Sequence, residues 1–594
     1  MPYPVYTETT YCRDCYKCVR ICPVKAIQIK EGSALIIKDR CIFCGKCVDV
    51  CPNKAKKIRS DLSRARMIIK SGKRTICSLA PSFASEFLGE ADKLLVVLKQ
   101  LGFYGISETA IGASIVSAAI DEYAKEHEGK CPWISTACPS VVELVRKYYS
   151  DDVSRLAHVP SPLQTHSAYL RHIYGDDIGI VFIGPCVAKK NEADETPGYP
   201  DVALTFNELR EWIENEHLSI KDADTSTVPS FIPAKAGLST YYPVERGQII
   251  TSSLWGDKPF CQDALALSGI NELSSVLDQV DSTTPFLELL GCEGGCINGP
   301  SSDRKLSLAK RKNAVIQFTK QRLDNNETLF VPPKEFVSEL LTKGYGILGS
   351  KQPTSATDFK KKFPESEITR ALAELGKITK ADELNCGGCG YNTCRDMAAA
   401  YLDGMAEAEM CVTKMRKEAQ SKVDVLLRTI PNAIVIVDSD LNIADCNINF
   451  LRIFGDMDES ILDESTLSLV SGLPLERFVP FFEKFRDEMY ANKRGQYRLH
   501  YKDKFLRVTF FLVEKNRLLG AMFEDITSPT VRRETVVKKA EDVIQKSLET
   551  VQQIASLLGE NAAETEIMLN SLIDAFSVHS DKNDGFTIDK DQDL

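Results

Sequence analysis

Two copies of one cysteine pattern near the start of the chain constrain its fold more than any other feature. The pattern is C-x2-C-x2-C-x3-C-P, which runs from Cys12 to Pro23 and again from Cys41 to Pro52. Three thiols at three-residue spacing wrap one face of an iron–sulfur cube, while the fourth reaches the second cube of a pair. Zinc sites usually pair C-x2-C with a distant second pair, so two zinc knuckles are the alternative that this spacing disfavours.

This repeat resembles the bacterial two-cluster ferredoxins, and the resemblance implies electron transfer. The pattern assigns the cysteines to two 4Fe-4S clusters, with the last cysteine of each run crossing to the other cluster. The first cluster takes Cys12, Cys15, Cys18 and Cys51, and the second takes Cys41, Cys44, Cys47 and Cys22.

Charge and hydropathy exclude several classes of partner. Lys and Arg number 73 against 83 Asp and Glu, a formal charge of −10 that argues against nucleic acid as the main partner. No apolar run approaches the roughly 20 residues of a membrane-spanning helix. The first residues lack a basic segment followed by an apolar one, so we expect a cytoplasmic protein in which the clusters among the 20 cysteines bind metal rather than form disulfides.

Changes in composition along the 594 residues predict a multidomain chain of α/β and α+β folds. Linkers are expected at 348–358 and near Ser421. The predicted segments are a ferredoxin-like domain at 1–60, an α/β domain at 61–365, a four-Cys domain at 366–420, a mixed α and β domain at 421–530, a helical segment at 531–578 and an acidic, disordered tail at 579–594.

Four further cysteines lie in three separated loops of the segment 61–365. Small residues beside them let the backbone approach a metal cluster closely, and four thiolates can hold one cube. Lys189 follows Cys186 by three residues, so one helical turn places its ammonium on the same side, where it can donate to an anionic ligand. Spacing alone leaves open a cube, a zinc site or four core thiols. The loops read S-T-A-C-P around Cys138, G-P-C-V-A-K-K-N-E around Cys186, and G-C-E-G-G-C-I-N-G-P around Cys292 and Cys296.

These loops resemble the three active-site signatures of iron-iron hydrogenases, and the resemblance covers residues 1–365. The most specific stretches are Pro185–Glu192 and Cys292–Gly299. The resemblance implies that Cys138, Cys186, Cys292 and Cys296 hold a cube, and that Cys296 also bridges to a diiron unit carrying carbon monoxide, cyanide and a dithiol bridge, which completes an H-cluster. It further implies cofactor contacts from Pro81, Ser82, Pro185 and Lys189, with Lys189 donating to a cyanide.

The first loop departs from the productive members of that family. They carry a cysteine, which passes protons to the diiron unit, where this chain has Ala137. A methyl group can neither donate nor accept a proton. The family also has carboxylates on the preceding helix, whereas residues 113–120 contain no acid and only Asp121 and Glu122 lie just beyond as substitutes. General acid–base assistance is worth about 10²–10⁴-fold, so we expect slow turnover with hydrogen binding retained.

The other two loops depart as well. Gly184 replaces the usual Met of the second loop, and residues 298–301 replace a run of glycines in the third. Together these substitutions are similar to those of the sensory branch of the family.

A second cysteine group has the spacing C-x2-C-x4-C-x16-C and resembles a small four-Cys iron–sulfur domain of several redox proteins. A helix over 395–410 is expected to carry the last cysteine back to a fourth cube, with zinc as the alternative. The proposed ligands are Cys386, Cys389, Cys394 and Cys411, which leaves Cys77, Cys131, Cys261 and Cys446 as inert core thiols.

Residues 426–454 predict a helix, a strand, a turn, a second strand and a helix, with later strands near 505–515 and 518–527. This order resembles a PAS sensor domain, which implies ligand binding, relay or dimerisation. His500 is the only histidine of the zone, so no histidine-based haem signature is present. Val537, Ile544, Val551 and Leu558 at spacing seven indicate a coiled coil, or else a helix packed on its own PAS domain.

Three functions are compatible with these features. The first is a hydrogen or redox sensor with weak hydrogenase activity, which signals through the PAS domain to a separate kinase or phosphatase, because no kinase signature or ATP-binding loop is present. The second is a working hydrogenase linked to ferredoxin, and the third is a cube-only scaffold or redox relay. The expected partners are H2 and protons, ferredoxin or another redox protein, maturation proteins that assemble the diiron unit, and a second copy in a homodimer.

Overall fold

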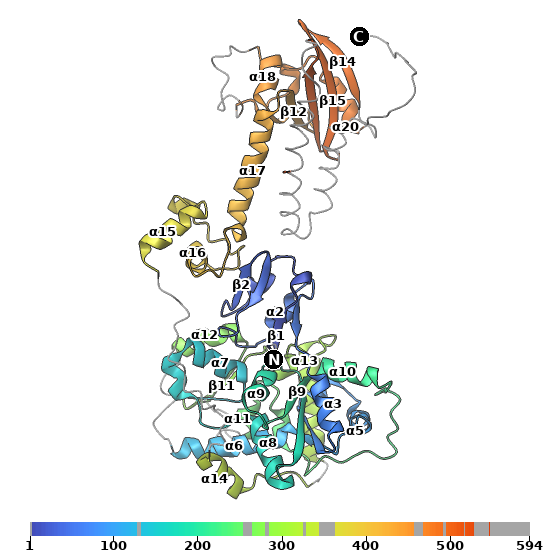
Figure 1. Cartoon of the computed structure of the whole chain (residues 1–594), viewed down its shortest axis with the longest axis vertical. Helices are drawn as coiled ribbons and strands as arrows, with labels where there is room; N and C mark the ends of the chain where they lie inside the picture. Colours follow the sequence, from blue (N-terminus) through green and yellow to red (C-terminus); the bar gives the residue numbers. More distant parts are fainter. Residues whose placement is uncertain are drawn as a thin grey trace. The chain divides into compact units, whose positions relative to one another are not determined.

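The structure is a computed structural model that divides into two compact units (Figure 1). The first comprises Met1–Cys12 and Tyr16–Glu407, and the second comprises Arg13–Cys15 and the chain from Ala408 onward. No helix in the described part of the chain is both long and apolar enough to cross a membrane. The described residues are 3–126, 132–252, 264–279, 284–324, 328–343, 363–456, 467, 469–490, 495–515, 517–527 and 546.

The ferredoxin-like segment folds as the cysteine repeat predicts, with two short helices in equivalent positions. Helix α1 follows Tyr16 and helix α2 follows Gly45, and both preceding residues have left-handed backbone conformations. Cys22 and Cys51 end these helices. Strand β1 pairs with β4 and strand β2 with β3, both antiparallel. The elements are β1 (Val5–Thr7), α1 (Lys17–Ile21), β2 (Ile27–Lys30), β3 (Ser33–Ile36), α2 (Lys46–Val50) and β4 (Lys56–Ile58).

The central α/β domain is built on a parallel four-stranded sheet in the order β6-β5-β8-β9. Both faces of β8 are buried: Val181 and Ile183 belong to one apolar cluster, and Ile178 and Ile180 to another. Apolar residues at successive positions are typical of parallel strands covered on both faces. A second parallel sheet has the order β10-β11-β7. The strands are β5 (Arg74–Leu79), β6 (Gly105–Glu108), β7 (Trp133–Ile134), β8 (Ile178–Gly184), β9 (Val202–Thr205), β10 (Ala264–Ser268) and β11 (Phe286–Leu290).

Helices connect these strands and supply the rest of the core. Helix α6 is almost wholly buried and packs against α8, and α3 and α10 pack against the sheet. The helices are α3 (Leu62–Lys70), α4 (Phe83–Glu86), α5 (Ala91–Gln100), α6 (Thr109–Glu126), α7 (Pro139–Tyr148), α8 (Pro162–Tyr174), α9 (Ala188–Glu195), α10 (Phe206–Asn215), α11 (Gly247–Thr251), α12 (Ile270–Gln279), α13 (Leu308–Asp324) and α14 (Lys334–Lys343).

The four-Cys segment contains α15 (Glu365–Glu374) and α16 (Cys394–Leu402), which pack together. The predicted helix over 395–410 is wrong in its extent, because α16 ends at Leu402. Gly404 has a φ of +68°, a left-handed conformation that stops a helix, and only a short 3-10 turn at Ala408–Met410 follows. The expected linker at 348–358 lies outside the described residues.

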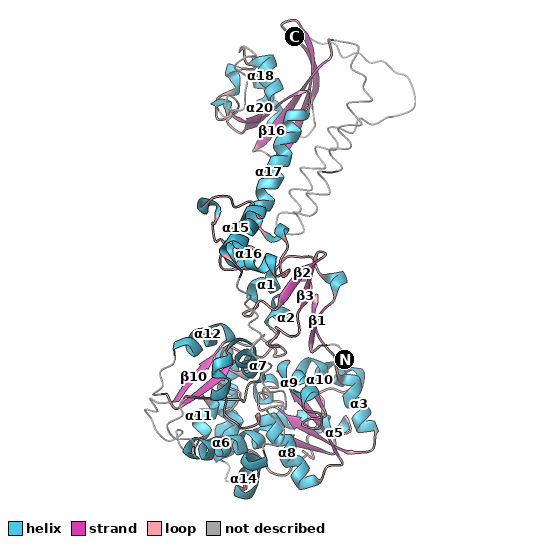
Figure 2. Cartoon of the chain, turned by 60° about the vertical axis from the view of Figure 1, so that its left-hand side comes forward, coloured by secondary structure: helices cyan, strands magenta, loops and turns pink. Residues whose placement is uncertain are grey.

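The second unit contains the mixed sheet predicted from the sequence, in the antiparallel order β13-β12-β16-β15-β14. Figure 2 labels β16 of this sheet together with α17, α18 and α20. Helix α17 runs through Ser421, the position near which the sequence predicted a linker. Strand β14 was missed, and the predicted heptads lie outside the described residues. The elements are α17 (Val412–Thr429), β12 (Ala433–Asp438), β13 (Ile443–Cys446), α18 (Ile448–Phe454), α20 (Glu483–Tyr490), β14 (Gln496–Tyr501), β15 (Lys504–Glu514) and β16 (Leu518–Asp525).

The ferredoxin-like segment and the central domain join within the first unit through close backbone contacts. An added Cβ at Gly45 would lie 2.4 Å from Cγ of Pro300, so only glycine allows this approach. Lys147 of α7 donates to the carbonyl oxygen of Cys41 at 2.7 Å, and Arg304 pairs with Asp49 at 2.8 Å. These contacts hold the second cysteine run against the loop that follows Cys296.

We predict that Gly45→Ala destabilises this junction more than Gly72→Ala does. Both glycines have left-handed φ angles, +77° and +82°, but an added Cβ at Gly72 meets no atom within 4 Å. Both variants incur the backbone cost of about 1–2 kcal/mol, and Gly45→Ala adds an overpacking cost of roughly 1–3 kcal/mol. Urea unfolding of anaerobically reconstituted protein measures the difference; equal unfolding midpoints would contradict the close approach.

Candidate functional site: a pocket lined by four cysteines

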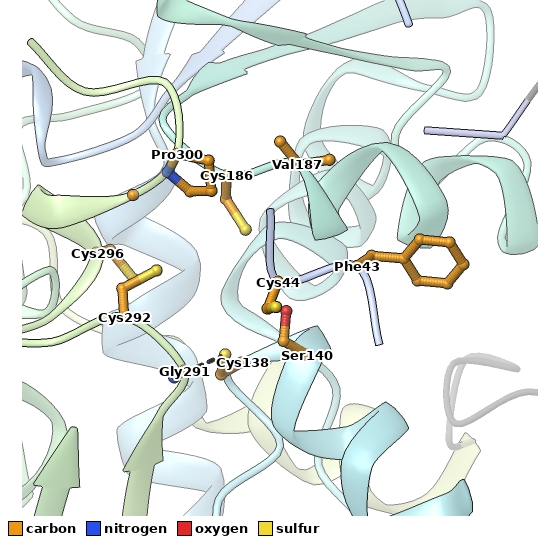
Figure 3. Close-up of a pocket in the computed structure, with 11 residues that line it drawn as sticks. Phe43, Cys44, Cys138, Ser140, Cys186, Val187, Gly291, Cys292, Cys296 and Pro300 are labelled. Atoms are coloured by element: carbon orange, nitrogen blue, oxygen red, sulfur yellow. Dashed lines mark hydrogen bonds between the residues drawn. The ribbon is translucent and has the colours of Figure 1, made fainter. Parts of the chain in front are cut away.

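The structure brings the four cysteines of the three central loops together around one pocket (Figure 3). Cys138 precedes α7, Cys186 lies between β8 and α9, and Cys292 and Cys296 follow β11. Carboxyl ends of parallel strands are where open α/β sheets place their ligands, and these loops leave the two parallel sheets there. The remaining lining residues are Phe43, Cys44, Ser140, Val187, Gly291, Gly299 and Pro300.

Glycines let the three loops approach one another around the pocket. The backbone N–H of Gly291 donates to Sγ of Cys138 at 3.4 Å, an interaction drawn in Figure 3. An added Cβ at Gly299 would lie 2.7 Å from the carbonyl oxygen of Pro185. At Gly295, which has a φ of +104°, it would lie 2.3 Å from the carbonyl oxygen of Pro243. The small residues of the loop motifs therefore allow close packing of backbone on backbone, whereas the sequence analysis related them to the approach of a metal cluster.

The four thiols lie close enough to affect one another electrostatically. Burial raises the pKa of the Cys186 thiol to about 11, with Cys138 adding to the rise and Lys189 opposing it. Burial raises the pKa of Cys292 and of Cys296 as well, and the other pocket cysteines raise both further. Bound metal reverses this balance, because a coordinating thiol is deprotonated outright. Four half-buried cysteines that line one pocket and form no disulfide are the kind of donor set that an iron–sulfur cube takes.

Lys189 lies in α9, three residues after Cys186, and is not among the residues that line the pocket. Its ammonium lowers the pKa of both Cys186 and Cys296. Its Nζ donates to Oγ of Ser161 at 2.9 Å and to Oε2 of Glu192 at 2.7 Å. Both contacts hold the ammonium at the margin of the cysteine pocket.

The neighbouring Lys190 anchors α9 instead of facing the pocket. This side chain is 1% exposed, and its Nζ forms ion pairs with Asp61 at 2.9 Å and Glu208 at 2.8 Å. A buried lysine needs such partners, and losing one partner of a buried pair costs about 3–5 kcal/mol. The two lysines of the K-K pair therefore have different roles.

The segment Ala80-Pro81-Ser82 lies beside the Cys186 loop because β5 and β8 are parallel neighbours. The N–H of Ala80 donates to the carbonyl oxygen of Ile183 at 2.9 Å. Ser82 is 1% exposed, and its Oγ has no hydrogen-bond partner. A buried hydroxyl without a partner is costly unless a ligand supplies one, so Ser82 fits a residue that contacts a bound group.

Ala137 has a polar neighbourhood that the sequence did not reveal. Its backbone N–H donates to Oγ of Ser135 at 3.2 Å, and Ser135 donates to Oε1 of Gln248 at 2.5 Å. Nε2 of Gln248 is buried and has no hydrogen-bond partner. Asp121 and Glu122 are the two acids of α6 that the sequence analysis named as substitutes for the missing carboxylates. Asp121 accepts a hydrogen bond from Ser252, and Glu122 is half-buried.

Glu288 in β11 is a buried acid near the pocket that the sequence analysis missed. It is 2% exposed, and its Oε2 accepts the N–H of Ile249 at 3.0 Å. Burial raises the pKa of Glu288 to about 7, although hydrogen bonds from the backbone around Gln248 lower it. Its charge raises the pKa of Cys296. A single acid within the apolar run F-L-E-L-L is the signal by which the sequence could have revealed it.

The ferredoxin-like cysteines partly follow the expected crossing. Burial raises the pKa of Cys41 to about 11 and of Cys44 to about 12, and the Cys22 thiolate raises both further, as it does for Cys47. Cys22 therefore lies beside the second run. The set Cys12, Cys15, Cys18 and Cys51, and the set Cys386, Cys389, Cys394 and Cys411, each include residues of both units.

Three family models match the chain. "Iron only hydrogenase large subunit, C-terminal domain" matches residues 73–260, which include Cys138 and Cys186. "4Fe-4S dicluster domain" matches 11–56. The family described as "Putative Fe-S cluster" matches 382–413, which contain all four cysteines of the second group. Two of these descriptions thus support iron–sulfur binding, at residues 11–56 and 382–413, and they disfavour the zinc alternatives.

Two curated proteins are similar to the chain. The NADP-reducing hydrogenase subunit HndD of Solidesulfovibrio fructosivorans is 25% identical over 372 residues, which cover 52% of this chain and 59% of that protein. The cytosolic Fe-S cluster assembly factor narfl of Xenopus tropicalis is 25% identical over 193 residues, or 29% of this chain and 40% of that protein. The chain thus spans less than two thirds of either relative.

Solved structures with partial similarity include a variant of the [FeFe]-hydrogenase HydA1 from Chlamydomonas reinhardtii, 18% identical, with a TM-score of 0.35 over 49% of this chain and 97% of that one. The PAS domain of an HTR-like protein from Haloarcula marismortui is 21% identical, with a TM-score of 0.16 over 19% of this chain and 97% of that one.

Residues 11–56 and 382–413 are thus similar to iron–sulfur domains. Residues 73–260 are similar to the large-subunit domain of the iron-only hydrogenases.

We predict that Glu288 holds a proton below about pH 7 and releases it above. A raised carboxyl pKa means that the neutral acid persists to higher pH than an exposed glutamate allows. Infrared difference spectra between pH 6 and pH 8 should contain a carboxylic-acid band that Glu288→Gln removes and the exposed Glu272→Gln leaves. Persistence of the full band in Glu288→Gln would assign it to another acid.

Proposed function

We propose that the chain is a hydrogen- or redox-sensing homologue of the iron-iron hydrogenases, with slow reversible H2 oxidation and proton reduction. One observation carries this proposal. Four thiols and the Lys189 ammonium converge as a cofactor site requires, whereas the residue before Cys138 is Ala137, which cannot move a proton. The site thus keeps the means to bind a cofactor and lacks the usual means to turn it over quickly.

The residues that hold the cofactor follow from the pocket and the family likeness. Cys138, Cys186, Cys292 and Cys296 bind a 4Fe-4S cube, and Cys296 bridges to the diiron unit of an H-cluster. When bound, that group supplies the reversible splitting of H2. Lys189 donates a hydrogen bond to an anionic ligand of the group. Pro81, Ser82 and Pro185 complete its surroundings, and the unpartnered hydroxyl of Ser82 supports this placement.

Protons must take a route other than a thiol at position 137. Ser135 and Gln248 surround the Ala137 amide, and Glu288 is the buried acid whose charge reaches Cys296. Without a positioned acid at Ala137, the reaction loses the assistance worth about 10²–10⁴-fold. The expected activity is therefore that of a weak ferredoxin-linked hydrogenase.

The remaining domains transfer electrons and transmit the signal. Two ferredoxin cubes within residues 1–60 and one four-Cys cube within 366–420 are the relay, the domain at 61–365 binds the H-cluster, and a PAS domain at 421–530 responds. The helical segment 531–578, ahead of the tail at 579–594, joins two copies in a homodimer. A separate kinase or phosphatase reads the output in the cytoplasm, and maturation proteins load the diiron unit.

Helix α17 supports a mechanical link inside the second unit, as Figure 2 illustrates. It begins directly after Cys411, whose Sγ lies 3.2 Å from Oγ1 of Thr413. At its other end, Asn449 donates to the carbonyl oxygen of Ile430 at 2.9 Å, which ties the helix end to the PAS-like sheet domain. A proposed cube ligand and the sensor domain are thus joined by one uninterrupted helix.

Two other functions remain as outcomes of experiment. Likeness to HndD, a hydrogenase subunit by name, favours a working ferredoxin-linked enzyme. Likeness to narfl, named as an Fe-S cluster assembly factor, favours a cube-only scaffold or redox relay. Turnover of the loaded protein separates the enzyme from the sensor, and the presence of a diiron unit separates both from the scaffold.

The proposed cofactor is tested by infrared spectroscopy on diiron-loaded protein under argon and then under hydrogen. Bands of metal-bound carbon monoxide and cyanide that shift under hydrogen are expected in the wild type. Cys296→Ser should lose these bands and keep the iron of the ferredoxin cubes, while Cys446→Ser, a buried thiol in β13, should keep both. Normal diiron loading in Cys296→Ser would falsify the assigned bridge.

We predict that Ala137→Cys raises the H2 turnover of fully loaded protein by about 10²-fold or more, because a thiol restores proton transfer at that position. Ala137→Ser is the matched control: its hydroxyl has similar size but is a far weaker acid, so the gain should be much smaller. Hydrogen evolution from a reduced viologen measures both rates. An unchanged rate in Ala137→Cys would place the bottleneck elsewhere.

A further inference from the structure

One face of the ferredoxin-like segment contacts the four-Cys segment through backbone groups. The N–H of Ile29 in β2 donates to the carbonyl oxygen of Met405 at 3.0 Å. Nε2 of Gln28 donates to the carbonyl oxygen of Gly404 at 2.7 Å. The N–H of Glu31 donates to a carboxylate oxygen of Glu407 at 3.0 Å. These three hydrogen bonds, one of them between two backbone groups, join residues 28–31 to residues 404–407.

Two arginines fasten the same contact beside the cysteine runs. Arg20, two residues before Cys22, donates to the carbonyl oxygen of Gly388 at 2.9 Å. Arg40, the residue before Cys41, pairs at 2.5 Å with Asp403, and both side chains are largely buried. Ion pairs of low exposure are less screened by solvent than surface pairs.

Glycine allows the closest approach. Gly390 follows Cys389 and has a φ of +96°, and an added Cβ there would lie 3.2 Å from the backbone nitrogen of Arg20. The side chain of Val19 is closer still, with Cγ1 at 3.0 Å from such a Cβ, so Gly390 packs tightly against residues 19 and 20, directly beside Cys389.

Lys25 lies between the two cysteine groups. Its Nζ donates to the carbonyl oxygens of Val19 and Arg20, both at 3.2 Å, and lies 6.0 Å from the ring centre of Tyr391. Burial lowers the pKa of Lys25, and the thiolates of Cys22 and Cys389 both oppose that shift. One ammonium is thus within electrostatic reach of a cysteine from each group.

The Cys22 group reaches the central pocket as well. Cys44, whose pKa Cys22 raises, lines the pocket of Cys138, Cys186, Cys292 and Cys296, and its charge raises the pKa of Cys292. The thiols at 22, 41, 44 and 47 therefore form a set with the central cysteines at one end and Cys389 at the other.

We propose that the cube held by Cys22, Cys41, Cys44 and Cys47 is the electron junction between the central pocket and the four-Cys cube, and that Lys25 is the positioning residue whose charge raises the reduction potential of both neighbouring cubes. This proposal rests on the cube assignments of the proposed function and not on hydrogen sensing. It gives the four-Cys domain a defined electron donor in the same chain.

The electron balance is simple. Oxidation of one H2 yields two protons and two electrons. The Cys22 cube is reduced by one electron and then oxidised when it passes that electron to the four-Cys cube, and a second electron reduces the Cys22 cube again. Both cubes end reduced by one electron each, the two protons leave to solvent, and no bond of the protein forms or breaks.

The test uses the full chain reconstituted with cubes and without the diiron unit, reduced stepwise with dithionite and followed by electron paramagnetic resonance. Lys25→Met removes a positive charge near both cubes, so both should become harder to reduce, by about tenfold in the reduction equilibrium or about 59 mV for one electron. Lys25→Arg keeps the charge and should restore both potentials. Lys70→Met, at the exposed end of α3, loses the same charge elsewhere and should change neither.

The signals are identified by deletion: Cys41→Ala removes the Cys22 cube, and Cys389→Ala removes the four-Cys cube. A shift of both potentials in Lys25→Met supports the proposal. A shift of only one cube, or of neither, overturns it. Because no diiron unit is present, this result is independent of whether the chain senses hydrogen.

A second measurement leaves Lys25 in place and so covers the case in which Lys25→Met does not fold. With all cubes of the wild-type chain reduced, the signal of the Cys22 cube should be broadened and relax fast, because the four-Cys cube is a paramagnetic neighbour. Cys389→Ala should sharpen that signal and slow its relaxation. An unchanged signal would show that the two cubes are not neighbours and would overturn the junction.

Discussion

The mutual approach of four half-buried cysteines is the constraint on which the rest of the first unit depends. Burial and neighbouring thiolates both raise the thiol pKa values, so deprotonating these thiols costs free energy. Two parallel sheets, the α9 anchor at Lys190 and glycines at the loop contacts hold the loops in place. Such a scaffold is costly to build without a metal, because the metal supplies the positive charge that the thiols need.

Close contacts at glycines also hold the ferredoxin-like segment within the first unit. Gly45 touches Pro300 on the central domain, and Gly390 touches Arg20 from the four-Cys side. Each of these glycines is next to a cysteine or one residue from it. Backbone contact beside cluster ligands shortens the gap between the groups they hold, so the docking surfaces and the electron route are built from the same residues.

The sequence predicted the chemistry better than the geometry. Cysteine spacing is a local property, and C-x2-C-x2-C-x3-C-P was enough to predict that Cys22 crosses to the second run, whose thiols it affects electrostatically. The helical turn between Cys186 and Lys189 was predicted for the same reason, because three-residue spacing is also local. Strand β14 was missed because its residues alternate between exposed and half-buried, a pattern without a strong apolar face.

Contacts between distant segments could not be predicted in this way. Nothing near Lys25 indicates that Tyr391 lies over it, and nothing near Ser135 indicates Gln248, since both pairs are more than 100 residues apart. The helix expected over 395–410 failed for a local reason, because a single glycine at 404 outweighed the favourable propensities around it. Glu288 is visible in the sequence as a lone acid in an apolar strand. Only the structure shows that backbone amides of α11 donate hydrogen bonds to it.

Loss of a proton-transfer residue and retention of an electron junction make sense together if the output depends on occupancy and not on flux. An enzyme gains from fast protons, whereas a sensor gains when its reduced state outlives the reaction that produced it. A 10²–10⁴-fold slower proton step prolongs that state by the same factor. In the proposed function, the electrons rest on the Cys22 and four-Cys cubes, and Cys411, the residue directly before α17, is the last ligand before the mixed sheet. A slow site and an electron path that ends directly before α17 then serve the same proposed sensor.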